Sequence, residues 1–160
     1  MKRTLCRLLG PFLLAAAAVL IASGCGGGDG TTTAEESTAE GGSAGKALVV
    51  NMGDYYFDPV NASANPGATT IEAVNVGKVE HELVLFRTDM NPADLPTGPD
   101  GTVEEEKMDK LAEAAGEVPD VEAGDAKSAQ FDLKPGKYVM FCNLPGHYAQ
   151  GMYGSLTVSK

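Results

Sequence analysis

The chain has 160 residues, enough for one domain and a leader, and it is acidic, with 22 Asp and Glu against 12 Lys and Arg. Three of the basic residues lie in a leader that we expect to be removed, which leaves nine basic residues and a net charge of −13. This excess of negative charge excludes nucleic acid as a partner.

The first 24 residues have the pattern of an export signal. Lys2 and Arg3 precede an apolar run over residues 8–22, and small residues then lead to Cys25. The junction Ala-Ser-Gly-Cys25 is similar to a bacterial lipobox, with Ala22 where leucine is more common. We expect residues 1–24 to be a signal peptide, Cys25 to carry lipid, and the protein to be tethered to the outer face of a bacterial membrane, in the periplasm or at the cell surface. An ordinary signal peptide followed by an unmodified cysteine is the alternative.

Residues 25–46 form a predicted linker. After Cys25 they are mainly Gly, Thr, Ser, Ala and Glu, with no large apolar side chain, so they cannot bury enough surface to offset the cost of ordering. We therefore expect a flexible, lipid-anchored tether that joins the membrane to a folded domain at residues 47–160.

From residue 47 onward, short apolar segments alternate with turn residues. Residues 47–52 are apolar and β-branched, residues 54–59 form an aromatic edge or turn, and residues 69–76 alternate so that Ile71, Ala73 and Asn75 share one face. Pro-Gly pairs at 66–67 and 135–136 predict turns between strands. Further strands are expected at residues 81–86, 131–133, 138–142 and 156–158. Many short strands with such turns predict an all-β antiparallel sandwich.

An acidic, partly helical insertion is predicted near residues 88–128. Thr102 as N-cap and Glu105 form a capping box, and four apolar residues lie at helical spacing on one face, which predicts a helix from Thr102 to Ala115 (Met108, Leu111, Ala112 and Ala115). The insertion is either an acidic decoration of the sandwich or a face that docks a partner.

Three potential metal donors lie on one loop near the end of the chain. Cys142, His147 and Met152 are five residues apart, and the sequence contains one further histidine, His81. Cys142 has no disulfide partner once Cys6 leaves with the signal and Cys25 is lipid-modified. A thiolate, two imidazoles and a weak thioether are the donors of a mononuclear blue-copper centre. Each residue alone has a simpler interpretation as a core residue, so the prediction depends on the set.

The residues around these donors resemble those of the cupredoxins, the small blue-copper family that includes plastocyanin, azurin, auracyanin and rusticyanin. The resemblance covers residues 46–160, and the spacing of the donors is most similar to rusticyanin and auracyanin. The resemblance depends on these segments: Asn75-Val-Gly before His81-Glu-Leu-Val-Leu, Pro135-Gly-Lys-Tyr-Val-Met-Phe-Cys, Pro145-Gly-His, and Gly151-Met. It implies a Greek-key β-sandwich.

The resemblance also implies a site. One copper ion, cycling between Cu(I) and Cu(II), would be bound by His81, Cys142 and His147, with Met152 as the axial ligand. Glu82 stands where family members often have Asn, Asp or Ser, and we expect it to contact Asn143. The exposed edge of His147, with Leu144, Pro145 and Tyr148 around it, would be the port through which electrons pass.

These features predict a one-electron carrier rather than an enzyme, because no further histidine is left for a catalytic copper. Redox proteins such as cytochromes or oxidases are the expected partners of a monomer. A copper storage or delivery protein without redox turnover is the alternative, and a plain adhesion sandwich with a vestigial site is a third reading.

Overall fold

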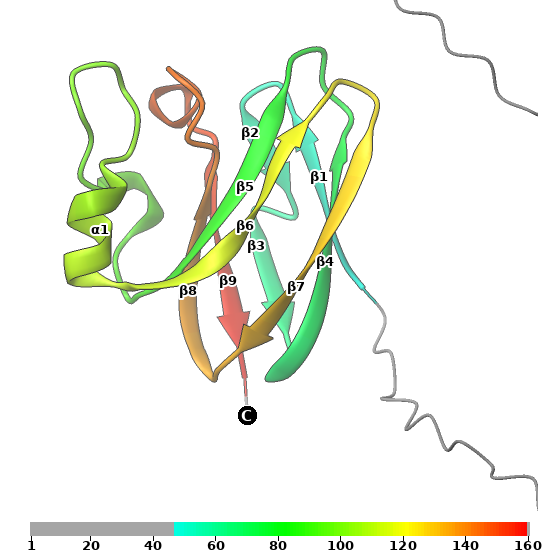
Figure 1. Cartoon of the computed structure of the whole chain (residues 1–160), viewed down its shortest axis with the longest axis vertical. Coiled ribbons are helices and arrows are strands. Elements are labelled where there is room, and N and C mark those ends of the chain that lie inside the picture. Colours follow the sequence, from blue (N-terminus) through cyan, green and yellow to red (C-terminus); the bar gives the residue numbers. More distant parts are fainter. Residues whose placement is uncertain (1–46, 160) are drawn as a thin grey trace, which may run out of the picture. The chain divides into compact units, whose positions relative to one another are not determined.

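The computed structural model describes residues 47–159, and within them nine strands form two facing sheets (Figure 1). One sheet has the order β2-β1-β4-β7 and the other β3-β9-β8-β5-β6. β1 pairs in parallel with β4, and β3 with β9, whereas the other pairs are antiparallel. The predicted all-β sandwich is confirmed, but the prediction that it is antiparallel is wrong for the β1–β4 and β3–β9 pairs. Its elements are β1 Leu48–Gly53, β2 Tyr56–Asp58, β3 Asn61–Ala64, β4 Gly67–Asn75, β5 His81–Arg87, η1 Pro92–Asp94, α1 Glu105–Leu111, β6 Glu113–Val121, β7 Ala126–Leu133, β8 Gly136–Phe141, η2 Tyr148–Gln150 and β9 Tyr153–Val158.

The first apolar core fills the space between the two sheets. It forms because alternate residues of each strand point to the same face of a sheet. In β4, Ile71, Ala73 and Asn75 are buried while the residues between them are partly exposed, as the sequence predicts. Leu83 and Leu85 of β5 face the same core. Gly67, the first residue of β4, has φ +103°, a conformation that glycine adopts without strain.

A second apolar core lies on the other face of β5 and β8. Val84 and Phe86 of β5 and Val139 and Phe141 of β8 pack there against residues from the segment that joins β5 to β6 (Leu95, Val103 and Met108). Both faces of β5 and β8 are therefore buried. We call residues 88–112 the insertion, and it forms a third layer over part of the sandwich.

The helix within the insertion is shorter than predicted. α1 spans Glu105–Leu111, and no side chain caps it. The backbone N–H and hydroxyl of Thr102 both donate to Oδ1 of Asp100, at 3.2 and 2.7 Å, so Thr102 belongs to a turn before the helix and the predicted capping box is absent. Met108 is buried as expected, but Leu111 is 62% exposed.

Residues 113–121 belong to the sandwich, so the insertion is narrower than predicted. They form β6, an edge strand that pairs with β5. His81 pairs with Val121 and Leu83 with Val118, which leaves one extra residue in β6 around Pro119 and Asp120, and Asp120 has φ +51°. Proline is tolerated in a strand at such an edge bulge, and bulges reorient neighbouring side chains.

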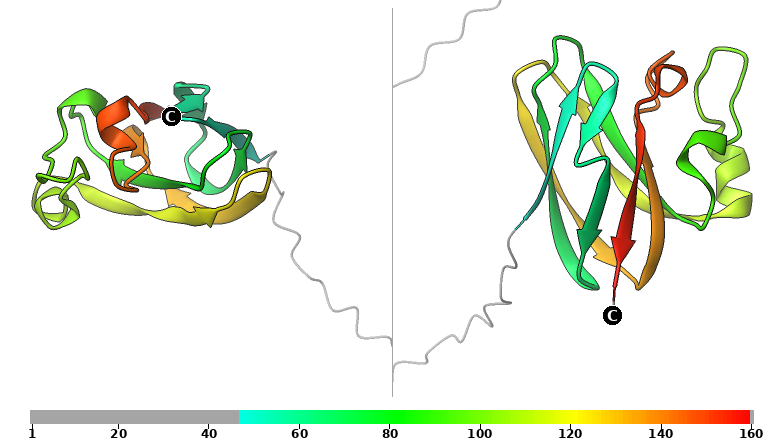
Figure 2. Two further views of the ribbon diagram at one scale, coloured as in Figure 1. Left: turned by 90° about the horizontal axis from the view of Figure 1, so that it is seen from above. Right: turned by 180° about the vertical axis from the view of Figure 1, so that it is seen from behind.

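The β1–β2 turn, the 76–80 loop and the loop between β8 and β9 lie at one end of the sandwich, and the chain ends at the other (Figure 1). The insertion lies beside the β8–β9 loop in both side views (Figures 1 and 2). Among the described residues, no helix has the length and apolar character needed to cross a membrane. The predicted signal peptide, Cys25 and the linker lie outside the described residues.

Candidate metal centre

The loop from Cys142 to Met152 is closed by its own backbone. The Cys142 N–H donates to the Met152 carbonyl at 3.1 Å, and the Met152 N–H donates to the His147 carbonyl at 3.2 Å. The His147 N–H donates to the Leu144 carbonyl at 3.0 Å. Gly146 and Gly151 have φ +81° and +101°, which glycine alone adopts at no steric cost. The three predicted donors on this loop are thus linked to one another through main-chain bonds.

His81 reaches the loop from β5, of which it is the first residue. The 76–80 loop before it is shaped by Asn75, whose fully buried side chain donates to the carbonyls of Val79 at 2.7 Å and Val121 at 2.8 Å. Oδ1 of the Asn75 side chain accepts the Gly77 N–H at 2.9 Å. Together with the β6 bulge, these bonds fix where the imidazole of His81 lies.

The structure brings His81, Cys142 and His147 together. Nδ1 of His81 lies 3.2 Å from Nδ1 of His147, and that nitrogen lies 3.3 Å from Sγ of Cys142. The ligand atoms of all three residues are within 4.8 Å of one another. Met152 is fully buried and belongs to the same apolar core as Cys142.

The chemistry of these donors fits a copper ion. Two imidazole nitrogens and a sulfur converge on one point, and a single cation between them would engage all three. A metal on Nδ1 leaves the proton of each imidazole on Nε2. Nε2 of His81 is buried without a hydrogen-bond partner, and the nearest carboxylate oxygen, Oδ1 of Asp54, is 3.9 Å away. An Nε2–H facing this carboxylate is the arrangement that a metal-bound His81 requires.

Burial keeps all three donors uncharged when no metal is bound. It raises the pKa of the Cys142 thiol to about 11. Desolvation lowers the pKa of His81, helped by the nearby His147, and desolvation also lowers the pKa of His147. Neutral imidazoles are ready to bind a cation, whereas the thiol must release its proton to do so.

Glu82 and Asn143 make the expected contact. Oε1 of Glu82 accepts the Asn143 backbone N–H at 2.9 Å, which ties the residue after His81 to the residue after Cys142. The Asn143 side chain points the other way, to Val103 and Glu105 of the insertion. Burial is the main cause that raises the pKa of Glu82.

Tyr148 does not lie on an exposed rim around His147, contrary to expectation. It is 5% exposed, because its ring packs in the second core and its hydroxyl bonds to the insertion. Pro145 is exposed, and His147 and Leu144 are partly exposed, so these residues remain where an electron port was predicted.

Tyr55 and Asp54 lie at the site and were not predicted from the sequence. The Tyr55 ring stands edge-on to His147 and His81, with centroids 5.1 and 6.5 Å apart, and its backbone has φ +68°. A tyrosine rarely adopts this conformation. Both residues are distant from the donors in sequence, and only the position of the β1–β2 turn beside His81 reveals them.

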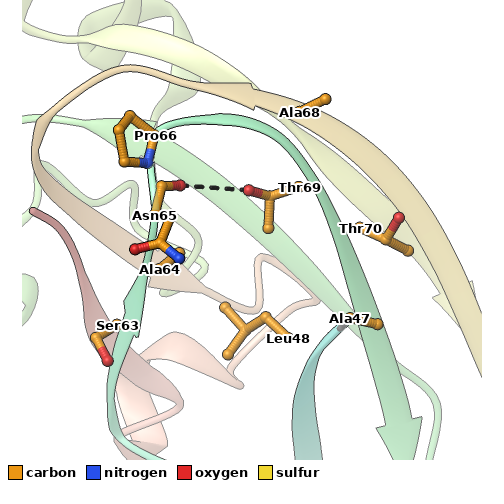
Figure 3. Close-up of a pocket in the computed structure, with 9 residues that line it drawn as sticks. All are labelled: Ala47, Leu48, Ser63, Ala64, Asn65, Pro66, Ala68, Thr69 and Thr70. Atoms are coloured by element: carbon orange, nitrogen blue, oxygen red, sulfur yellow. Dashed lines mark hydrogen bonds between the residues drawn. The ribbon is translucent and has the colours of Figure 1, made fainter. Parts of the chain in front are cut away.

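The pocket drawn in Figure 3 lies away from this centre. It is bordered by the start of β1, the end of β3 and the start of β4, and none of its lining side chains is titratable (Figure 3). We assign no chemistry to it.

Comparisons with known proteins agree with the geometry. Residues 44–159 match the profile of the copper binding proteins of the plastocyanin/azurin family. Reduced auracyanin of the photosynthetic bacterium Roseiflexus castenholzii is 21% identical with a TM-score of 0.54, over 73% of this chain and 99% of that one. Auracyanin B is 25% identical with a TM-score of 0.53, over 71% of this chain and 88% of its own. The azurin Az-iso2 of Methylomonas sp. strain J is 19% identical with a TM-score of 0.52, over 71% of this chain and 98% of its own. No curated protein sequence matches the chain.

Proposed function

The chain belongs to the plastocyanin/azurin family of copper-binding proteins, the cupredoxins, and from this premise we propose that it carries single electrons between redox partners. Copper is its cofactor, and His81, Cys142, His147 and Met152 are the residues that would hold it. When bound, copper supplies one-electron chemistry by alternating between Cu(I) and Cu(II). The protein's part is to hold the donors still and to connect one of them to the surface.

The observation that carries this proposal is the convergence of the three donors on a loop that is already closed by backbone bonds. Nδ1 of His81, Nδ1 of His147 and Sγ of Cys142 lie within 4.8 Å of one another. Donors held in place by the loop backbone favour electron transfer, because a rigid site needs little rearrangement when the charge of its metal changes. His147 is partly exposed while the other donors are fully buried, so its ring supplies the shortest route to solvent.

Copper storage or delivery without redox turnover is the alternative function. Rapid release requires donors that an acceptor can reach. Cys142 and His81 are 0% exposed, so an acceptor would have to open the 142–152 loop to reach them. This burial favours the carrier.

Copper binding is tested by adding one equivalent of Cu(II) to the purified protein. We expect an intense visible band from thiolate-to-copper charge transfer, absent in Cys142→Ser, which keeps a side chain of similar size without the thiolate. A colourless copper complex, or a band that survives in Cys142→Ser, would contradict the ligand assignment.

Location and partners are part of the proposal and rest on the sequence. We propose that the protein is exported, lipid-modified at Cys25, and tethered to the outer face of a bacterial membrane. There it would act as a monomer with cytochromes or oxidases and without catalysing a reaction of its own. The wild-type protein should fractionate with membranes, whereas Cys25→Ala should be released in soluble form. Equal membrane association of the two would contradict lipid attachment.

A further inference from the structure

Tyr148 follows the ligand His147 and ties it to the insertion. Its hydroxyl accepts the Leu95 backbone N–H at 3.0 Å and donates to the Pro92 carbonyl at 2.8 Å. The ring is buried against Phe141, with centroids 6.3 Å apart. A tyrosine hydroxyl that both donates and accepts has a fixed orientation, so this side chain sets the distance between the loop and the insertion.

Asn143 follows the ligand Cys142 and makes a second tie. Its side-chain carbonyl accepts the Val103 N–H at 2.6 Å, and its amide donates to the Val103 carbonyl at 3.0 Å. The same amide donates to Glu105 at 2.8 Å. The side chain of Asn143 therefore pairs with the Val103 backbone much as a neighbouring strand would.

The insertion is itself rigid where these ties attach. Thr97 and Val103 form an isolated bridge, the Glu104 N–H donates to the Pro96 carbonyl at 2.8 Å, and Val103 is 3% exposed. The turn of this hairpin touches the ligand loop directly. A Cβ on Gly101 would lie 3.2 Å from Cβ of Ala149 and 3.8 Å from Cα of Gly146.

These contacts share a pattern. The residue that follows each of the three strong donors makes a hydrogen bond that holds the site together. Glu82, after His81, accepts the Asn143 N–H. Asn143, after Cys142, bonds to Val103, and Tyr148, after His147, bonds to Pro92 and Leu95. The insertion makes two of these three ties and adds the apolar second core beneath them. Its contacts to the 142–152 loop do not involve any ligand atom, so they are available with or without metal.

We infer that the insertion is a brace for the ligand loop, and that Tyr148 and Asn143 are positioning residues which hold Cys142 and His147 in the metal-binding arrangement before copper arrives. The inference rests on the proposed copper-carrier function. It gives the acidic insertion a role within the molecule. Loss of either tie should loosen the loop in the copper-free protein and speed the departure of copper from the loaded one.

The test compares Tyr148→Phe with Tyr153→Phe in the full chain. Tyr148→Phe keeps the packed ring and removes only the hydroxyl. Tyr153 is the matched control, because its ring lies 5.3 Å from that of Tyr148 and its hydroxyl makes no hydrogen bond among the described residues. Asn143→Ala is a second, independent variant. The two readouts are amide hydrogen exchange of residues 142–152 in the copper-free protein and the rate of copper transfer to an excess of chelator.

We expect Tyr148→Phe and Asn143→Ala to raise the rate of copper transfer about tenfold or more, because loss of a group that orients metal ligands typically weakens metal binding by at least that factor. Both variants should also raise amide exchange in residues 142–152 more than twofold, with Tyr153→Phe unchanged. Amides of β4, in the other sheet, should keep their wild-type exchange. Rates within twofold of wild type in both variants would overturn the inference, and so would equal acceleration in β4 and in the loop, which is general destabilisation. If the wild-type protein forms no blue copper centre, the proposed function fails, whereas exchange in the copper-free protein still tests the brace.

Discussion

At the scale of single residues, burial decides the protonation of the metal donors. Cys142 and His81 are 0% exposed, and the low polarity around them disfavours their charged forms. The thiol is therefore protonated and the imidazoles are neutral in the copper-free protein. Each group ionises more easily in the unfolded chain, in the direction that its pKa shift gives.

Stability of the copper-free protein should consequently fall on both sides of neutrality. The pKa values of His81 and His147 are lowered from 6.5, so their contribution to stability is present above pH 6.5 and is lost as pH falls through their folded values. The pKa of Cys142 is raised from 9.0 to about 11, so its contribution is present below pH 9.0 and is lost as pH rises. The alkaline loss should reach about 2 kcal/mol by pH 11.

Urea unfolding followed by far-ultraviolet circular dichroism at pH 5.5, 7.5 and 11 measures these losses. Tyr148, whose pKa is also raised by burial, adds to the alkaline side. Cys142→Ser is the control, because serine does not ionise in this range and the alkaline loss should shrink. A free energy of unfolding that is flat to pH 11 in the wild type would contradict burial of the thiol.

The donor residues could be predicted from sequence because three of them lie on one loop, where spacing alone brings them together. His81 could be predicted as the second imidazole ligand because the sequence contains only two histidines. Tyr55 and Asp54 could not be predicted in the same way. They approach His81 only through the pairing of β1 with β4, which is a property of the whole sandwich.

At the scale of elements, local pattern predicts the strands better than the insertion. β4 alternates and forms as expected, because one face of it is buried. Residues 113–115 (Glu-Ala-Ala) continue a helical pattern, yet they begin β6, since pairing with β5 outweighs their helix propensity. In β8 both faces are buried from Tyr138 to Phe141, because the insertion covers the outer one.

The 76–80 loop depends on Asn75, and its removal should be costly. Asn75→Ala removes the side-chain donor of the Val79 and Val121 carbonyls. The Gly77 N–H loses its bond to Asn75 but keeps its bond to the Met52 carbonyl. We expect a loss of about 1 to 3 kcal/mol in the free energy of unfolding of the copper-free protein. Asn51→Ala, a strand residue whose side chain makes no hydrogen bond among the described residues, should change it by less than about 0.5 kcal/mol. Equal effects of the two substitutions in urea unfolding would contradict the role given to Asn75.

At the scale of the whole molecule, the net negative charge acts over the longest distance. The chain without residues 1–24 has a net charge of −13, and several of the negative charges lie on α1, within the insertion (Glu105, Glu106 and Asp109). Such a field accelerates the approach of cations and slows that of anions, and salt weakens both effects.

Oxidation of the reduced protein by small inorganic complexes should therefore depend on salt in opposite directions. Between low salt and about 0.5 M, where the screening length falls to a few ångströms, the rate with a cationic cobalt(III) complex should decrease severalfold and the rate with ferricyanide should increase. Stopped-flow absorbance at the blue band follows both reactions. The same salt response with the two oxidants would show that the negative charge lies too far from the electron route to steer a partner.

Reversible voltammetry of the copper-loaded protein, repeated with excess chelator, tests the claim of a one-electron carrier most directly. We expect a single reversible one-electron wave whose height is preserved over many cycles while the chelator removes little copper. An irreversible wave, or copper that passes to the chelator each time it is reduced to Cu(I), would contradict the carrier and identify the protein as one that handles copper.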